Sequence, residues 1–145
     1  MDFSDTEAEA AFRAEARAWL DGNAVLKEHP NQTWASVLKD KTRANIVRLN
    51  KEFQKKRYED GWACLHWPRE YGGRDCSAME RVIYSQEEGR YIVPRGVVEI
   101  GQGMAGPILM KYATEDQKVR YLQPMAKGEE IWCQIFSEAA AGSDL

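Results

Sequence analysis

The residues at 137–144 have the types that suit a ligand-binding backbone. They read Ser-Glu-Ala-Ala-Ala-Gly-Ser-Asp and follow a β-prone run, and their small side chains would let a ligand approach the main chain. The backbone N–H groups and the two serine hydroxyls could hold an anionic or carbonyl-rich group. A simple turn after a strand accounts for the same residues equally well, so on chemistry alone both interpretations stand.

A glycine pattern at residues 101–106 is the second candidate. The sequence GQGMAG matches G-x-G-x-x-G and follows the strand-like residues 97–100. In a nicotinamide-dinucleotide site, such glycines open a helix whose N-terminus holds the pyrophosphate, inside a parallel βαβ unit. The next β-prone run, near residue 131, is not followed by the rest of a parallel sheet. We therefore favour a glycine-rich helix or bend against which another element packs closely.

The other reactive side chains do not form a catalytic or metal-binding set. Cys64 and His66 are separated by one residue, but a zinc site needs about four ligands at set spacings, and the only other histidine is His29. A nucleophilic pair of the same two residues has no further support. The adjacent glutamates at 87–88 and at 129–130 point to different faces of a helix, so neither is a natural acid–base pair. We expect no metal site, and we expect both glutamate pairs on the solvated surface.

The composition limits the class of protein. The chain has 145 residues, 43% of them hydrophobic and 30% charged, which is enough for one folded domain. Its 20 basic and 23 acidic residues argue against a general nucleic-acid-binding protein. No apolar run approaches the roughly 18–20 residues that span a bilayer. The acidic N-terminal residues do not resemble a secretory signal, and the three cysteines include no C-x-x-C pair, so we expect a cytoplasmic protein with free thiols.

Helical patterns fill most of the chain. Capping boxes, in which Ser or Thr is followed three residues later by Glu or Gln, predict helices that begin at Ser4, Ser77 and Thr114. A further long helix is expected over about residues 34–60, with Gly61 at its C-terminal end. The basic run within this helix is expected to be a solvated face, because acidic residues dilute its charge.

Residues 131–136, Ile-Trp-Cys-Gln-Ile-Phe, form the first convincing β-prone run of the chain. A lone strand does not end a stable domain, because its backbone groups need a paired neighbour. We therefore expect a helical domain over residues 1–127 and, over residues 128–145, the start of a truncated β-rich domain.

Three stretches, in this order, resemble the N-terminal part of the acyl-CoA dehydrogenase family. The first stretch, residues 61–73, begins with Gly-Trp and ends with His-Trp-Pro-Arg-Glu-Tyr-Gly-Gly. The second, residues 106–122, begins with Gly-Pro and ends with Thr-Glu-Asp-Gln-Lys-Val-Arg-Tyr-Leu. The third, residues 132–144, begins with Trp-Cys-Gln-Ile-Phe-Ser-Glu and ends with Ala-Gly-Ser-Asp. The last stretch resembles the bacterial branch. The resemblance implies the all-α N-terminal domain of the acyl-CoA dehydrogenase fold, ending in the first strand of a truncated middle β-domain.

The resemblance also implies a reaction, the α,β-dehydrogenation of an acyl-CoA thioester with FAD as cofactor. In the family a glutamate removes the α-proton, and a hydride passes from the β-carbon to the flavin. The residues that fall where the family contacts the cofactor are Gln134, Ile135, Phe136, Ser137, Gly142 and Ser143. The residues that fall where the family contacts the acyl-CoA substrate are Ser143, Val97, Gly101 and Met104. Glycines on the helix that lines the acyl pocket would leave room for a bulky or long acyl group.

No catalytic residue is expected in this chain itself. The family's glutamate base and its C-terminal four-helix bundle have no counterpart among the 145 residues, so we expect the chain alone to be inactive. Ala139 stands where the family usually has proline, which should loosen the turn after Glu138.

The resemblance implies partners as well. The complete enzyme would be a homo- or hetero-oligomer that passes electrons to electron-transfer flavoprotein or a similar acceptor. One alternative is a non-catalytic partner subunit of a mixed acyl-CoA dehydrogenase complex, which would travel with a flavin-containing chain. Another is the nicotinamide enzyme, which would bind NAD(P)H.

Overall fold

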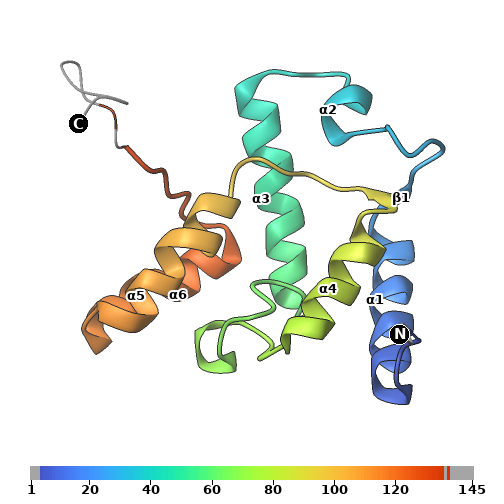
Figure 1. Ribbon diagram of the computed structural model, residues 1–145. Helices are drawn as coiled ribbons and strands as arrows, with labels where there is room; N and C mark the ends of the chain where they lie inside the picture. Colours follow the sequence, from blue (N-terminus) through green and yellow to red (C-terminus); the bar gives the residue numbers. More distant parts are fainter. Residues whose placement is uncertain (1–3, 136, 138–145) are drawn as a thin grey trace.

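The computed structural model describes residues 4–135 and 137, and these form a helical domain (Figure 1). Its helices are α1 (Glu7–Asn23), α2 (Trp34–Val37), α3 (Arg43–Glu59), α4 (Ala78–Glu88), α5 (Gly106–Tyr112) and α6 (Glu115–Lys127), with a 3₁₀ turn η1 (Arg69–Tyr71) and a π-helical segment η2 (Gly101–Ala105). The expected all-α domain is therefore confirmed. Within the described residues, none of the helices is long and apolar enough to cross a bilayer.

A short antiparallel ribbon was not expected from the sequence. It pairs β1 (Val25–Leu26) with β2 (Tyr91–Ile92), so that Val25 lies opposite Ile92 and Leu26 opposite Tyr91. Two residues per strand are too few for an alternating apolar pattern to be recognised in the sequence.

Two of the three predicted capping boxes form, at Ser77 with Glu80 and at Thr114 with Gln117. The first helix begins at Glu7 rather than after Ser4, because Thr6 and Glu9 make the capping box instead. Starting the helix there leaves Asp5 outside it, where its carboxylate accepts hydrogen bonds from Arg13 at 2.5 and 2.9 Å. The prediction of Ser4 as the cap was therefore wrong by two residues.

The long helix predicted over residues 34–60 is divided into α2 and α3. Between them the Asp40 carboxylate accepts the Thr42 N–H at 2.9 Å, and the Thr42 hydroxyl accepts the Asn45 N–H to cap α3. An aspartate that binds the backbone two residues further on competes with the helix, which explains the break. Gly61 does follow the C-terminal end of α3 in a left-handed conformation, with φ of 75°, as predicted.

Among the described residues, the core has three apolar clusters. The first lies between α1, α4 and the loop after α3, and consists of Phe12, Ala16, Trp62, Leu65, Ile83 and Tyr84. The second lies against α6 and consists of Ala63, Cys64, Trp67, Leu122, Met125 and Ala126. The third lies beside the ribbon and consists of Leu20, Tyr91 and Val93. The loop over residues 62–67 contributes to the first two clusters, so it joins the α1–α4 pair to the α5–α6 pair on the other side of α3 (Figure 1).

Residues 131–135 do not form a strand. They have no regular secondary structure, and in the described part of the chain the sheet contains only β1 and β2. A β-prone sequence becomes a strand only when a neighbour pairs with its backbone groups. The division into a domain over residues 1–127 and the start of a β-domain over 128–145 stays a prediction.

Candidate functional site

The glycine pattern lies inside a helix. Residues 99 and 100 are already helical, the π-helical segment η2 follows, and α5 continues it without a break. The Gly106 N–H donates to the carbonyl oxygen of Gly101. A dinucleotide site would need a strand at 97–100 followed by a helix that begins at the glycines, but the helical run already begins at residue 99. The dinucleotide interpretation is therefore wrong. The favoured alternative, a glycine-rich helix with a closely packed neighbour, is confirmed.

At two of the three glycines, the absence of a side chain allows another part of this protein to pack closely against the helix. A Cβ at Gly106 would overlap the ring of Trp67, and a Cβ at Gly101 would lie 3.2 Å from the Cβ of Trp132 and 3.3 Å from the Cγ of Met125. Gly103 has no such neighbour within 4 Å. Of the glycines in this pattern, Gly103 is therefore the one that leaves open space beside the helix.

The two glycines that follow Trp67 in the sequence, Gly72 and Gly73, are required by a tight loop. The Trp67 carbonyl accepts the Asp75 N–H at 3.0 Å, and Gly73 lies so close to the Trp67 backbone that a side chain there would overlap it. Gly72 adopts a φ of 88°, which favours glycine. The loop over residues 67–75 thus closes tightly, and the fully buried Trp67 ring points from it into the second cluster.

The outer face of the same helix is apolar and exposed. It carries Ile100, Met104 and Ile108, which are spaced four residues apart, and Met104 is 47% exposed. Among the residues predicted to contact the acyl group, Met104 is thus accessible, Val97 is half-buried and Gly101 is buried under Trp132. The helix predicted to line the acyl pocket therefore presents an apolar surface that a hydrocarbon group could cover.

The predicted flavin segment begins beside this helix. Trp132 packs against Gly101, and its ring meets Tyr121 edge-on with centroids 5.3 Å apart. Of the residues predicted to contact the cofactor, Gln134, Ile135 and Ser137 are exposed. The other three, Phe136, Gly142 and Ser143, lie outside the described residues, as does Ala139. The structure thus brings Trp132, two residues before the predicted cofactor segment, next to the predicted substrate helix.

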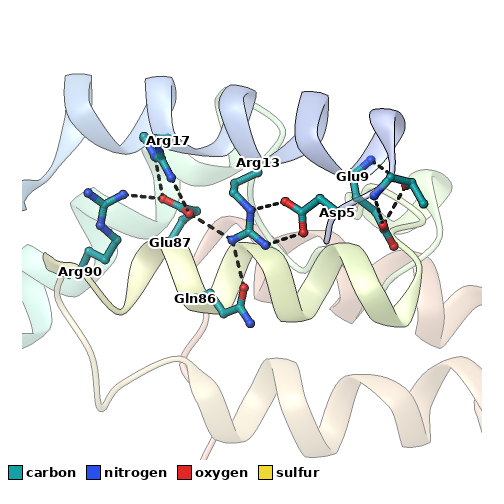
Figure 2. Close-up of polar contacts among 8 residues, drawn as sticks. Asp5, Glu9, Arg13, Arg17, Gln86, Glu87 and Arg90 are labelled. Carbon is teal, nitrogen blue, oxygen red and sulfur yellow. Dashed lines mark hydrogen bonds and ion pairs between the residues drawn. The ribbon is translucent and has the colours of Figure 1, made fainter. Parts of the chain in front are cut away.

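The expectation of a solvated surface is wrong for the pair Glu87 and Glu88, which are only 3% and 8% exposed. Two arginines of α1 and one from the turn after α4 converge on Glu87 (Figure 2): Arg17 at 2.9 and 3.0 Å, Arg13 at 3.1 Å and Arg90 at 2.9 Å. Glu88 pairs with Arg57 and Arg95. The arginines on α1 are about seventy positions from Glu87 in the sequence, which explains why spacing did not reveal them.

This arginine clamp, which consists of Asp5, Arg13, Arg17, Glu87 and Arg90, is not built for proton transfer. The hydrogen bond from Arg17, opposed by burial and reinforced by Arg13 and Arg90, lowers the pKa of Glu87 to about 2. A carboxylate with so low a pKa is a poor general base at neutral pH. The clamp instead joins α1 to α4.

The second glutamate pair, Glu129 and Glu130, lies closer to the solvated surface on which it was expected. Glu129 is exposed, and Glu130 is half-buried and pairs with Arg120 at 2.6 Å.

The thiols and histidines show no reactive arrangement. Burial raises the pKa of the Cys64 thiol to about 12, and burial followed by the charge of Arg81 lowers the pKa of His66. A thiol with a raised pKa carries too little thiolate to act as a nucleophile. The cysteines are free, and across residues 4–135 and 137 no group of His, Cys, Asp or Glu could hold a metal ion.

Residues 6–129 match the family model described as the N-terminal domain of acyl-CoA dehydrogenase. The chain belongs to the acyl-CoA dehydrogenase family. Acyl-CoA dehydrogenase IpdE1 from Mycolicibacterium smegmatis is 36% identical over 140 residues, which are 92% of this chain and 33% of that protein. Acyl-CoA dehydrogenase FadE26 from Mycobacterium tuberculosis is 30% identical over 145 residues, which are all of this chain and 34% of that protein.

Solved acyl-CoA dehydrogenases share the fold. The Tcur3481–Tcur3483 steroid acyl-CoA dehydrogenase matches with a TM-score of 0.63 and 27% identity, over 99% of this chain and 35% of that one. The ChsE4–ChsE5 complex from Mycobacterium tuberculosis matches with a TM-score of 0.58 and 27% identity, over 89% of this chain and 30% of that one. The chain spans about a third of the length of the relatives it matches.

Proposed function

We propose that this chain is the N-terminal part of an FAD-dependent acyl-CoA dehydrogenase that introduces a double bond between the α and β carbons of an acyl-CoA thioester. The observation that carries the proposal is the family match over residues 6–129, together with the exposed apolar face of the helix over residues 99–112. The catalytic base and most contacts to the flavin would come from parts of the enzyme beyond these residues, so the chain alone would be inactive.

The residues of the predicted cofactor segment fit a flavin. Gln134, Ile135 and Ser137 are exposed and offer an amide, an apolar side chain and a hydroxyl, which suit the polar edge and apolar face of the flavin ring. FAD would supply the acceptor for the hydride. The other predicted contacts, Phe136, Gly142 and Ser143, belong to the same proposal. The reduced cofactor would pass its electrons to electron-transfer flavoprotein or a similar acceptor.

We propose a bulky acyl group as the substrate. Met104 and the open space beside Gly103 would take the acyl chain, with Gly101 on the same helix, Val97 just before the helix begins, and Ser143 toward the CoA arm. The match to a protein described as a steroid acyl-CoA dehydrogenase supports a group of that size.

The first experiment is to purify the protein from its native source, measure its intact mass and record its flavin absorbance. Oxidation of acyl-CoA thioesters would then be followed with an artificial electron acceptor. A mass well above 16.6 kDa, bound flavin and acyl-CoA oxidation would support the proposal. A flavoprotein of that size that oxidises no acyl-CoA would contradict it.

A non-catalytic partner subunit is the second candidate. Two of the solved relatives are described by a pair of different protein names, as is expected for mixed assemblies. If the native mass equals that of these 145 residues and a separate flavin-containing chain co-purifies, this candidate replaces the first. Co-purification would be measured by mass spectrometry of the native assembly in the same preparation.

A further inference from the structure

The π-helical segment puts two glycines that are five residues apart onto one face of the helix. In a regular α-helix, five residues turn through about 500°, so Gly101 and Gly106 would point about 140° apart. Here the Gly106 N–H bonds to the Gly101 carbonyl, five residues back. As a result both glycines face the second apolar cluster, Gly101 toward Met125 and Trp132, and Gly106 toward Trp67.

This arrangement leaves the Gln102 carbonyl without a donor from its own helix. Its partner in a regular α-helix would be the Gly106 N–H, which is bound to Gly101, and its partner in a π-helix would be residue 107, which is proline and has no N–H. The Trp67 indole Nε1–H donates to this oxygen at 3.1 Å. The fully buried Trp67 therefore supplies the bond that the π-turn removes.

Further contacts hold the same turn from the inner side. The Gln102 side-chain amide donates to the Met125 carbonyl on α6 at 3.2 Å, and the Trp67 ring fills the space that a side chain at Gly106 would need. With Gly101 and Gly106 both turned inward, Gly103 and Met104 are turned outward. The composition of the exposed face thus depends on the π-turn.

We propose that Trp67 is a positioning residue that sets which acyl groups the enzyme accepts, because its indole holds residues 101–105 in the π-helical turn that presents Gly103 and Met104 outward. This inference rests on the proposed function. It assigns no contact with substrate to Trp67, which is buried on the opposite side of the helix. In a regular α-helix, Gly101 would rotate toward the outer face, and the surface offered to the acyl group would change.

The test uses the complete flavin-loaded enzyme with Trp67→Phe, which keeps an aromatic side chain at this position but lacks the indole donor. We expect the ratio of kcat/KM for a steroid side-chain acyl-CoA over octanoyl-CoA to change by about tenfold, a size typical of losing a buried hydrogen-bond donor. A crystal structure of the variant should show the Gly106 N–H bound to the Gln102 carbonyl instead of Gly101.

Trp19→Phe is the matched control. Trp19 also donates its indole N–H to an oxygen, that of Asp60 at 2.8 Å, but it lies in the α1 region. A general loss of stability would affect both variants, whereas the selectivity ratio should change only in Trp67→Phe. An unchanged ratio, or an equal change in both variants, would overturn the inference.

The two proposals fail in different ways. If the wild-type enzyme oxidises neither thioester, the proposed function fails, and the crystal structure of Trp67→Phe still decides whether Trp67 holds the turn. If the wild type is active and the π-turn persists unchanged in the variant, the inference fails while the proposed function stands.

Discussion

The contact that the arginine clamp makes between α1 and α4 and the packing around the helix of residues 99–112 stabilise the fold in opposite ways. Between α1 and α4, charged side chains meet in the arginine clamp, where one buried carboxylate binds three guanidinium groups. Between the helix of residues 99–112 and its neighbours, the contact depends on missing side chains, at Gly106 under Trp67 and at Gly101 under Trp132. The stabilisation by the clamp should depend on pH. The packing around the glycines should be insensitive to pH, and it should not accommodate an added methyl group at Gly106.

Gly106→Ala should have the largest effect on stability. Its Cβ would overlap the Trp67 ring, and the fully buried ring has little room to move, so we expect a loss of about 3 kcal/mol in the free energy of unfolding. The measurement is chemical denaturation of the purified protein. Gly22→Ala is the control, because Gly22 lies in α1 with nothing near its missing Cβ. That change should stabilise by roughly 0.5–1 kcal/mol, and equal losses in both variants would contradict the packing argument.

Glu87→Gln should come next, with a loss of about 2 kcal/mol at neutral pH. Glutamine keeps the shape but removes the charge that three arginines share, and Arg17 and Arg90 are exposed enough to regain water. Chemical denaturation at pH 7 measures the difference. A loss below ~0.5 kcal/mol would mean that the clamp contributes to geometry rather than to stability.

The same variant should reveal the pH dependence of the clamp. The pKa of Glu87 falls from 4.5 to about 2 in the folded protein, so its contribution to stability is present above pH 4.5 and is lost as the pH falls toward 2. Between pH 7 and pH 3 the loss is roughly 2 kcal/mol for one such group. The gap between the wild type and Glu87→Gln should therefore narrow at pH 3, while the gap between the wild type and Gly106→Ala should stay constant. Thermal unfolding at both pH values would test this.

Glu52→Gln should have the smallest effect, below about 0.5 kcal/mol. Glu52 pairs with Arg48 at 2.8 Å on α3, but both side chains are more than half exposed. The comparison with Glu87→Gln at pH 7 isolates the effect of burial on an ion pair. Similar losses in the two variants would show that burial does not distinguish them.

The sequence was most informative where the signal is local. Capping boxes at Ser77 and Thr114 predicted two helix starts, because the residues that satisfy the first N–H groups are three positions apart. The break between α2 and α3 was missed, although residues 39–43 carry no apolar side chain, because it depends on a single aspartate that binds the backbone. The clamp at Glu87 was missed because its partners lie far away in the sequence.

The candidate site, too, could be predicted only in part from the sequence. That the glycine pattern is a closely packed helix could be predicted, since the rest of a dinucleotide fold is missing from the sequence. Which glycine faces the core could not be predicted, because periodicity assumes 3.6 residues per turn and the π-turn departs from it. The partner that stabilises this turn, Trp67, lies 35 positions from Gln102.

The π-turn has a consequence for how related chains should be aligned. It contains one residue more than a regular helix needs to bring Gly101 and Gly106 onto the same face. A relative whose helix is regular throughout can make the same inner contacts with these two positions four residues apart. Such a chain should align with this one only after a single-residue gap between positions 101 and 106, and an alignment without that gap would match core residues of one protein to surface residues of the other.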